Sequence, residues 1–360
     1  MEQGRRRGSR RPVKGRTPRR SKSQRLRRRD VRRMREFHFG QKRHVHEVRH
    51  VWVNDGVFLS EDDHTAKGLR YLCRHLVGLC VTYRHTAGGE AQLPARFATC
   101  SGTLLFVEGA LYFLTAGHVL KRLRELRDCE SVEIEGAALA DVFGYRRVSD
   151  TPIPFDLRNA QLCFVDDEEL GLDFGVIPIG PHHARLLAKN GMVALSEENW
   201  LKQHSVKFEG YAILGFPAEF VSERVSDSST VRIEPTMFAV RGLEPAQDYR
   251  RTQYPRFVGQ VSEGLPLKSL EGMSGGLIFG FRTEPQLTYW IVAIQSSWNP
   301  QTRMVYGCGL PVLASLMTHW AKESIAVLQE LDPNAAVICP TVPNAALPTT
   351  PNLVGRITEA

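Results

Sequence analysis

The sequence predicts an all-β fold, either a sandwich or a barrel, followed by one C-terminal helix. From about residue 67 to about residue 310 the chain consists of short apolar or alternating runs separated by turn residues. Closely spaced strands of this length, with few helical periods between them, are typical of all-β folds. The runs that predict strands are SGTLLFVEG, ALYFLTAG, SVEIEG, AQLCFVD, DFGVIPIG, GYAILGFP, GGLIFGF and LTYWIVAIQSS.

Two further local patterns support this prediction. Glu108-Gly109 separates two of the runs and predicts a tight hairpin. The helix is predicted by PVLASLMTHWAKESIAVLQEL, in which apolar residues recur with helical spacing. Pro311 suits the first turn of that helix and Pro333 ends it.

Length and composition describe an ordinary globular protein. The chain has 360 residues, of which 42% are hydrophobic and 24% charged, which excludes disorder along its whole length. This length allows two domains or one two-lobed domain with tails. No run of roughly eighteen apolar residues occurs, so the sequence predicts no transmembrane segment.

The net charge of +8 is unevenly distributed. Residues 1–50 contain 20 Lys and Arg against 4 Asp and Glu, which leaves 27 and 35 for the rest of the chain. We therefore predict a basic, largely disordered extension over residues 1–66. Three interpretations stay open: a solvated tail, a contact with nucleic acid or another polyanion through phosphates, or a true start at Met34. No aromatic residue precedes Phe37, which argues against base stacking.

Cysteine and histidine spacing gives no indication of a metal or redox centre. The seven cysteines form no CxxC pair and the chain has no HExxH. His182 and His183 are adjacent, so their side chains diverge on a strand or a helix. Because the N-terminus shows no apolar signal run either, we expect a reducing, cytoplasmic location and no cofactor.

Three short motifs carry candidate chemistry. His118 lies in TAGHV, Asp173 in GLDFGVI and Ser274 in EGMSGG. A serine hydroxyl needs a base to attack at neutral pH, and histidine is the side chain whose pKa suits that role. A carboxylate fixes the histidine tautomer and stabilises the imidazolium. The nearest alternatives to Asp173 are Asp166 and Asp167.

Each motif alone has an ordinary structural explanation: a surface or core histidine, a turn aspartate, or a glycine-rich hairpin. Their joint occurrence inside a predicted all-β region favours an acyl-transfer site. Glycine at position 272 can adopt the backbone conformation that turns N–H groups towards a developing oxyanion.

These motifs resemble those of the trypsin-like serine peptidases. TAGHVL resembles the histidine box, GLDFGVIPI the aspartate segment, and GMSGGLIF the serine box usually written GDSGGP. The resemblance also includes CSGTLLF and AIQSSW and spans about residues 68–331. It implies two antiparallel β-barrels with the active site between them. We expect barrel one at about 68–195, barrel two at about 205–310, the helix at 311–331, and a proline-rich flexible tail at 332–360.

The resemblance also implies roles for individual residues. Ser274 would be the nucleophile, His118 the general base and Asp173 the residue that orients it. The backbone N–H groups of Gly272 and Ser274 would form the oxyanion hole. Ser296 would pair with the substrate backbone, with Ser297 as a one-residue alternative. The expected partner is a protein or peptide substrate.

Several departures from the family pattern are informative. Met273 replaces the aspartate that receives a new N-terminus on zymogen cleavage, which resembles bacterial-type members that need no such activation. Cys100 lacks its usual partner, because Val119 stands at that position, and Leu270 replaces another half-cystine. Lys268 lies where the family often places the base of the substrate pocket. A cation there would favour an acidic substrate side chain, although a solvent-facing lysine is the interpretation we prefer.

Two other classes of function stay open. One is a catalytically silent protease-fold module that binds peptides, and the other is a nucleic-acid-associated protein acting through residues 1–50. The complete set of three residues favours a serine endopeptidase over the silent module.

Overall fold

The computed structural model describes most of the predicted globular region. Every described residue lies in the compact unit of residues 39–360. The described residues are 51–54, 57–58, 64–86, 95–143, 148–196, 207–220, 222–226, 228–243, 252–262, 267, 269–282 and 288–331.

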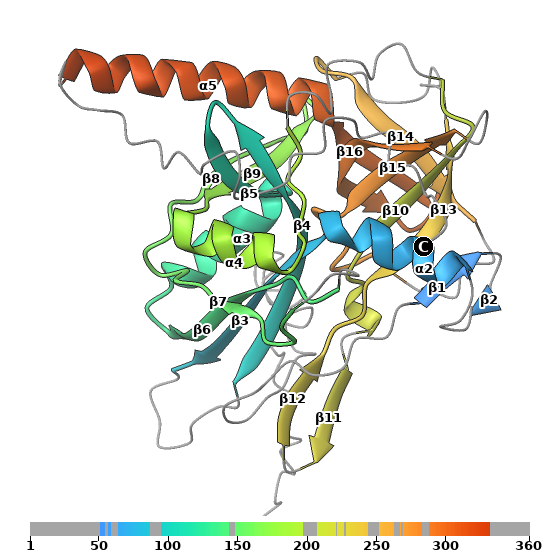
Figure 1. The fold of residues 1–360 in the computed structure, drawn as a ribbon, viewed down its shortest axis with the longest axis horizontal. Coiled ribbons are helices and arrows are strands. Elements are labelled where there is room, and N and C mark those ends of the chain that lie inside the picture. Colours follow the sequence, from blue (N-terminus) through green and yellow to red (C-terminus); the bar gives the residue numbers. More distant parts are fainter. Residues whose placement is uncertain are drawn as a thin grey trace, which may run out of the picture. The chain divides into compact units, whose positions relative to one another are not determined.

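The first sheet is formed by the strands between residues 77 and 178 (Figure 1). Within the described residues it has seven strands in the order β7-β6-β3-β4-β5-β9-β8, with antiparallel neighbours throughout. The predicted hairpin is confirmed: Val107 pairs with Ala110 across Glu108 and Gly109, both with positive φ. The strands are β3 (Val77–His85), β4 (Arg96–Val107), β5 (Ala110–Thr115), β6 (Val132–Ala140), β7 (Ile153–Pro154), β8 (Cys163–Asp167) and β9 (Leu172–Pro178).

The second sheet closes into a barrel. Its described strands follow the order β10-β15-β16-β17-β14-β13-β1-β2, and β10 also pairs with β13. That additional pairing joins the two sides of the sheet, so the strands from β10 to β13 form a closed ring. The strands are β10 (Gly210–Gly215), β13 (Thr236–Gly242), β14 (Arg256–Val261), β15 (Leu277–Arg282), β16 (Thr288–Asn299) and β17 (Met304–Gly309).

Part of the predicted extension contributes to this second sheet. Strand β1 (Val51–Asn54) pairs in parallel with β13, and β2 (Val57–Phe58) pairs with β1. Helix α2 (His64–Leu72) follows. The structure therefore differs from the disordered extension that we expected up to residue 66. The sequence VWVN carries the β-branched and aromatic residues that favour strands, a signal that the basic composition before it obscured. Residues 1–50 and 332–360 lie outside the described residues.

Helices occupy the connections and the C-terminal end. The predicted terminal helix is confirmed as α5 (Leu310–Leu331). Three helices were not predicted, namely α2, α3 (Gly117–Arg127) and α4 (Pro181–Lys189), because each is short and buries few apolar residues. The remaining elements are the 3₁₀ turns η1 (Cys73–His75) and η4 (Ala218–Phe220) and the hairpin β11 (Ser222–Ser226) and β12 (Ser228–Arg232). None of the described helices is long and apolar enough to cross a membrane.

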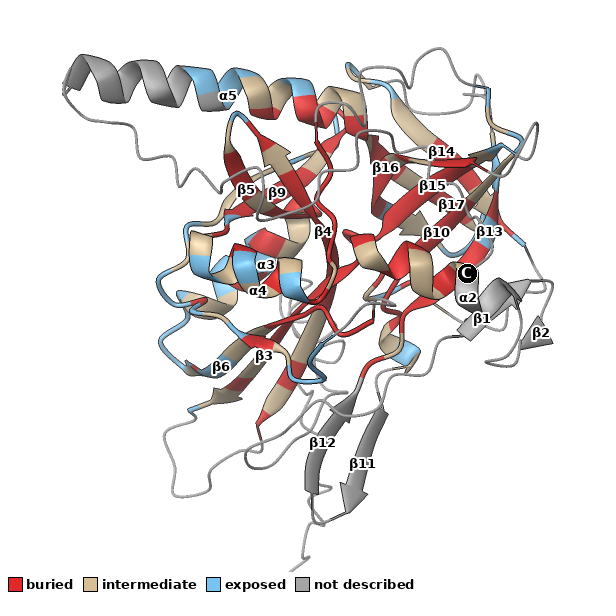
Figure 2. Ribbon diagram, viewed as in Figure 1, coloured by how far each residue is buried: buried red, intermediate tan, exposed pale blue. Residues whose placement is uncertain are grey.

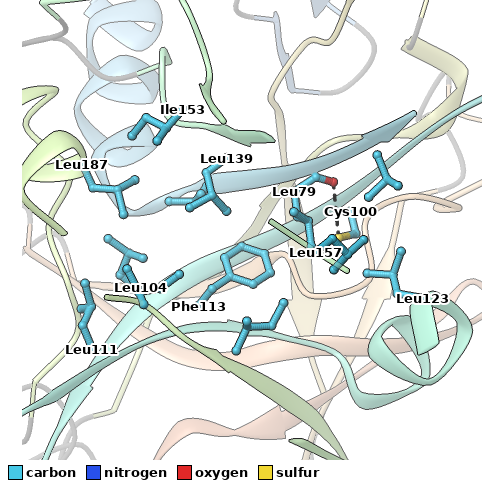
Figure 3. Close-up of a cluster of buried hydrophobic side chains, with 14 of the residues drawn as sticks. Leu79, Cys100, Leu104, Leu111, Phe113, Leu123, Leu139, Ile153, Leu157 and Leu187 are labelled. Atoms are coloured by element: carbon cyan, nitrogen blue, oxygen red, sulfur yellow. Dashed lines mark hydrogen bonds between the residues drawn. The ribbon is translucent and has the colours of Figure 1, made fainter. Parts of the chain in front are cut away.

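Each β unit has its own apolar core (Figure 2). In the first, Leu79, Leu104 and Phe113 are completely buried, and the Cys100 thiol donates to the Leu79 carbonyl (Figure 3). In the second, Ile213, Phe238, Met273, Ile278 and Ala293 belong to one cluster, which we call the second-barrel core. The predicted all-β class, with two β units and a C-terminal helix, is confirmed.

Candidate active site

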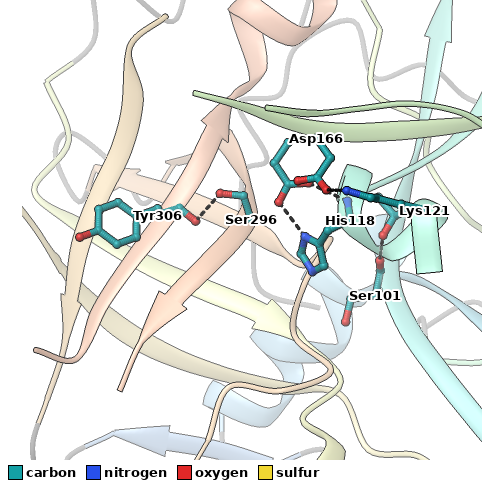
Figure 4. Close-up of polar contacts among 8 residues, drawn as sticks. Ser101, His118, Lys121, Asp166, Ser296 and Tyr306 are labelled. Atoms are coloured by element: carbon teal, nitrogen blue, oxygen red, sulfur yellow. Dashed lines mark hydrogen bonds and ion pairs between the residues drawn. The ribbon is translucent and has the colours of Figure 1, made fainter. Parts of the chain in front are cut away.

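His118 and Asp173 form a two-point contact within the first β unit. His118 lies in the first turn of α3, directly after β5, and Asp173 is near the start of β9. The backbone N–H of His118 donates to Asp173 Oδ1 at 2.9 Å, and Nδ1 donates to Oδ2 at 2.7 Å (Figure 4). Because one carboxylate binds both the backbone N–H and Nδ1, the imidazole has a fixed orientation. Nε2 is the ring nitrogen that takes no part in this contact.

Close packing sets the position of this histidine. Helix α3 packs against β8 and β9. A Cβ atom at Gly117 would lie 1.8 Å from the Val165 carbonyl oxygen, so only glycine permits the helix to begin this close to the strand. The sequence Thr115-Ala116-Gly117-His118 thus places the imidazole beside β9.

The rival carboxylates have other partners. Asp166 lies opposite Asp173 in the β8–β9 pair, but its Oδ2 accepts from Lys121 Nζ at 2.8 Å. Asp167 accepts two backbone N–H groups of the following turn, each at 2.9 Å. Among the three aspartates, Asp173 alone contacts His118.

The serine motif folds as two consecutive tight turns, which we call the serine turn (residues 270–276). Met273 N–H donates to the Leu270 carbonyl at 3.1 Å, and Gly276 N–H donates to the Met273 carbonyl at 2.7 Å. Gly272 and Gly275 occupy the third position of each turn with φ of 86° and 87°. A positive φ at that position favours glycine, which explains the G-x-x-G spacing.

The hydrogen bonds of the serine turn leave the backbone donors on either side of Met273 unused. Met273, Gly275 and Gly276 all donate, with Gly275 bonded to the Gln295 carbonyl at 2.8 Å. Within the described part of the chain, the N–H groups of Gly272 and Ser274 donate to no other residue. These are the two groups that the resemblance assigned to an oxyanion hole.

Ser101 joins the serine turn to the first sheet. Its hydroxyl donates to the Gly272 carbonyl at 3.0 Å and accepts from Phe216 N–H at 2.9 Å. Thr115, three residues before the histidine, donates to the Ser101 carbonyl at 2.7 Å. A Cβ at Gly275 would lie 2.1 Å from both Thr115 Oγ1 and the Ser101 carbonyl. The two motifs therefore meet across this strand. Ser101 was not singled out from the sequence, where a polar residue in the apolar run CSGTLLF was the only signal.

The nucleophile candidate is not hydrogen-bonded to the base in this structure. Ser274 is half-buried, and its hydroxyl makes no hydrogen bond to any described residue. The contacts among Ser101, Thr115 and Gly275 bring its turn to the strand that leads into His118. Contacts between nucleophile and base in such sites are often long before substrate binds and tighten afterwards.

Met273 points into the protein. Its side chain is completely buried in the second-barrel core. The position that the resemblance associates with a buried ion pair is therefore filled by apolar packing, which stabilises by roughly 1.5–3 kcal/mol for a side chain of this size.

Two predicted substrate-binding residues have different outcomes. Ser296 is buried on β16 at a break in the strand register, and its hydroxyl donates to the Tyr306 carbonyl at 3.2 Å (Figure 4). Its neighbour Ser297 is exposed. Lys268 lies outside the described residues.

Cys308 is a further residue that the sequence did not indicate. Burial raises the pKa of this thiol to about 12, and the thiol hydrogen-bonds the backbone of Asp173. Since Cys308 belongs to β17, the second barrel contacts the backbone of the aspartate through this hydrogen bond.

The architecture defines the class of protein. A first β unit carrying the histidine–aspartate pair, a closed second barrel carrying the serine turn, and a terminal helix together form a chymotrypsin-type protease fold. The predicted resemblance to trypsin-like peptidases is confirmed for the fold, whereas independence from zymogen cleavage stays a prediction.

Comparison with known proteins gave matches among solved structures. No family model and no curated protein matches the sequence. The similar structures include the protease Anisep from Arthrobacter nicotinovorans, with 15% identity, 66% of this chain and 90% of that one covered, and a TM-score of 0.35. A thermostable serine protease, AL20, from an extremophilic microorganism has 10% identity, 71% and 98% coverage, and a TM-score of 0.38. A Glu endopeptidase has 12% identity, 68% and 90% coverage, and a TM-score of 0.37.

Proposed function

We propose that this protein is a serine endopeptidase that uses Ser274, His118 and Asp173. The observation that carries the proposal is the two-point bond between Asp173 and His118, which fixes the orientation of the imidazole. Asp167 and Asp166 are held by other partners, so the geometry favours one particular histidine–carboxylate pair.

The mechanism follows from these positions. His118 Nε2 takes the proton of the Ser274 hydroxyl as the oxygen attacks the substrate carbonyl, and Asp173 stabilises the imidazolium that forms. The N–H groups of Gly272 and Ser274 stabilise the oxyanion of the tetrahedral intermediate. His118 then gives its proton to the leaving amine. In the second half of the reaction His118 takes a proton from water, the water oxygen attacks the acyl group, and the Ser274 oxygen leaves with that proton. The substrate is a protein or peptide, whose backbone pairs with β16 near Ser296.

A fluorophosphonate probe tests this proposal directly. The probe forms a covalent bond only with an activated serine, so we expect the full chain to be labelled once, at Ser274. Ser274→Ala removes the label, and Ser262→Ala, at a serine that follows β14, retains it. A folded wild-type protein that resists the probe would instead be a silent protease-fold module that binds peptides.

The basic segment supports a separate proposal of binding. Its charge favours contact between residues 1–50 and a polyanion through phosphates. Affinity for an RNA or DNA oligonucleotide should fall steeply as salt increases and vanish when the segment is removed. Binding that ignores salt would contradict a contact through phosphates.

A further inference from the structure

Three consecutive peptide groups carry the backbone donors on either side of Met273. They join Glu271 to Ser274, and the N–H groups of Gly272 and Ser274 belong to the first and the third of them. In a trans peptide the C=O and N–H groups point in opposite directions, so a bond to the carbonyl of a peptide also sets the direction of its N–H. The aim of each donor therefore depends on what holds the carbonyl of its own peptide.

Backbone bonds hold the carbonyls of the two outer peptides. Ala218 N–H donates to the Glu271 carbonyl at 2.7 Å, and Gly276 N–H donates to the Met273 carbonyl at 2.7 Å. Ala218 belongs to η4, the short turn that follows β10. The first bond sets the direction of one candidate oxyanion donor, and the second sets the direction of the other.

A side chain from the first β unit holds the middle peptide. The Ser101 hydroxyl donates to the Gly272 carbonyl at 3.0 Å and accepts from Phe216 N–H at 2.9 Å, and the residue is 0% exposed. Among the described residues, Ser101 supplies the only side-chain bond to these three peptides. Phe216 comes two residues before Ala218, so the same hydroxyl also fixes the short segment that holds the Glu271 carbonyl.

Close packing makes this arrangement sensitive to small displacements. A Cβ at Gly272 would lie 2.6 Å from the Phe216 carbonyl oxygen and 2.8 Å from Ala218 N, and a Cβ at Gly215 would lie 2.9 Å from Ser101 Oγ. Without the hydroxyl, Phe216 N–H and the Gly272 carbonyl lose the partner that they share. Buried polar groups without a partner are destabilising, so both segments would move to find new ones.

Strand β16 holds the other end of the serine turn without any help from Ser101. Gln295 N–H donates to the Gly276 carbonyl and its carbonyl accepts from Gly275 N–H, each at 2.8 Å. These bonds involve backbone atoms only. Loss of the Ser101 hydroxyl should therefore displace the Gly272 side of the turn and leave the other side in place.

We propose that Ser101 is a positioning residue that keeps the oxyanion hole formed before substrate binds. This inference rests on the proposed function. Ser101 acts through the Gly272 carbonyl and through residues 216–218. Electrostatic stabilisation of an oxyanion depends on donors that are already in place when the charge develops. A displaced Gly272 N–H therefore slows the chemical step and leaves the binding of substrate unchanged.

Ser101→Ala tests this role by comparing transition-state binding with ground-state binding. We expect kcat to fall by about 10–100-fold, the effect of a misplaced donor, while KM stays the same. A peptide aldehyde, whose adduct with Ser274 places an oxygen between the two donors, should bind more weakly by a similar factor. The matching peptide alcohol forms no adduct and should bind equally well. The pH dependence of kcat/KM should not change, because the His118–Asp173 bonds do not involve the Ser101 hydroxyl.

A matched control lies on the same strand. Thr103 is also completely buried in β4, and its hydroxyl oxygen has no partner among the described residues. Thr103→Val therefore removes a hydroxyl without breaking a bond, and kcat and aldehyde affinity should stay at their wild-type values. If Ser101→Ala does not fold, Ser101→Cys keeps a side chain of similar size with a weaker donor and should give a smaller loss of the same kind.

The outcomes distinguish this inference from the proposed function. A folded wild type that neither reacts with the fluorophosphonate nor cleaves any peptide refutes the proposed function, and the inference with it. A labelled, active wild type whose folded Ser101→Ala variant retains its kcat and aldehyde affinity overturns the inference alone. Equal losses of aldehyde and alcohol affinity, or a shifted pH profile, also overturn it, because Ser101 would then act on substrate binding or on the base.

Discussion

The two halves of the candidate site are held by different kinds of interaction. In the first β unit, side-chain bonds between His118 and Asp173 fix the base. In the second, backbone turns with glycine at positive φ present Ser274, and no side chain bonds its hydroxyl among the described residues. The comparison teaches that the base depends on which side chains are present, whereas the nucleophile depends on where side chains are absent.

Ser101 is one of the residues that connect the two halves. Ser101 belongs to β4 of the first sheet, yet its hydroxyl bonds Gly272 and Phe216 of the second. Movement of the serine turn relative to the base is therefore limited by one buried hydroxyl and by close packing at Gly275. The following predictions separate the two halves by the size of their effects.

Ser274→Ala should give the largest loss. Without the proposed nucleophile no acyl-enzyme forms, and by comparison with a known triad enzyme kcat should fall on the order of 10⁶-fold. The fold should persist because the change is small and the turns rest on backbone bonds. Peptide hydrolysis is measured together with a thermal unfolding curve. Retained turnover by the folded variant would contradict the assignment of the nucleophile.

Asp173→Asn, in the half of the site where side-chain bonds fix the base, should give the next largest loss of kcat. The amide can donate to Nδ1 and so stabilise the wrong imidazole tautomer, which lowers kcat by roughly 10⁴-fold at neutral pH. Asp166→Asn is the matched control, because Asp166 lies directly across the β8–β9 pair and bonds Lys121. An inactive Asp166→Asn beside an active Asp173→Asn would show that the wrong carboxylate was chosen.

Gly272→Ala tests the half held by backbone. A Cβ there would lie 2.6 Å from the Phe216 carbonyl at a φ of 86°. The turn must therefore shift, and its N–H groups no longer point at the oxyanion. Loss of one oxyanion donor lowers kcat by about 10²–10³-fold. Gly109→Ala is the control, since Gly109 has a φ of 80° but nothing within 4 Å of its Cβ position. We expect it to reduce stability only.

The sequence predicts candidate catalytic residues, but it does not predict the packing around them. His118, Asp173 and Ser274 could be named because each lies in a short motif whose chemistry is local. The all-β class followed from alternating runs, and α5 from its long apolar stripe. Ser101, Cys308 and Gln295 could not be found in this way, because their importance comes from strands that meet only in the folded chain. Helix α3 was missed since it buries only Gly117, Leu120 and Leu123.

A second carboxylate in the first unit sharpens the contrast with Asp173. Asp141 is completely buried, and only its Oδ2 has a partner, the Asn190 amide at 2.9 Å. Burial raises its pKa to about 7 from 3.8. The native state therefore binds a proton more tightly than the unfolded chain, and the free energy of unfolding falls as pH rises from about 4 to about 7.

Asp141→Asn should remove this dependence. Compared with wild type, the variant should gain on the order of 1–3 kcal/mol in the free energy of unfolding between pH 4 and pH 8, because a neutral amide carries no burial penalty for charge. Urea unfolding at both pH values gives the difference between the two proteins, in which all other groups cancel. A difference that does not change with pH would show that Asp141 titrates normally.

Removal of residues 1–33 should have the smallest effect. In zymogen-type trypsin-like peptidases the corresponding turn depends on an ion pair with a freed N-terminus. Here Met273 is completely buried among apolar residues and cannot form that pair. The turn therefore needs no charge supplied from outside the fold. We expect kcat/KM, measured per titrated active site, to agree within about twofold between the full chain and a chain starting at Met34, a difference of less than about 0.5 kcal/mol. A large gain on truncation would identify the basic segment as an inhibitory pro-segment, and a large loss would show that it supports the catalytic fold. Either result would mean that the serine turn is not held by its own backbone, Ser101 and Met273 alone.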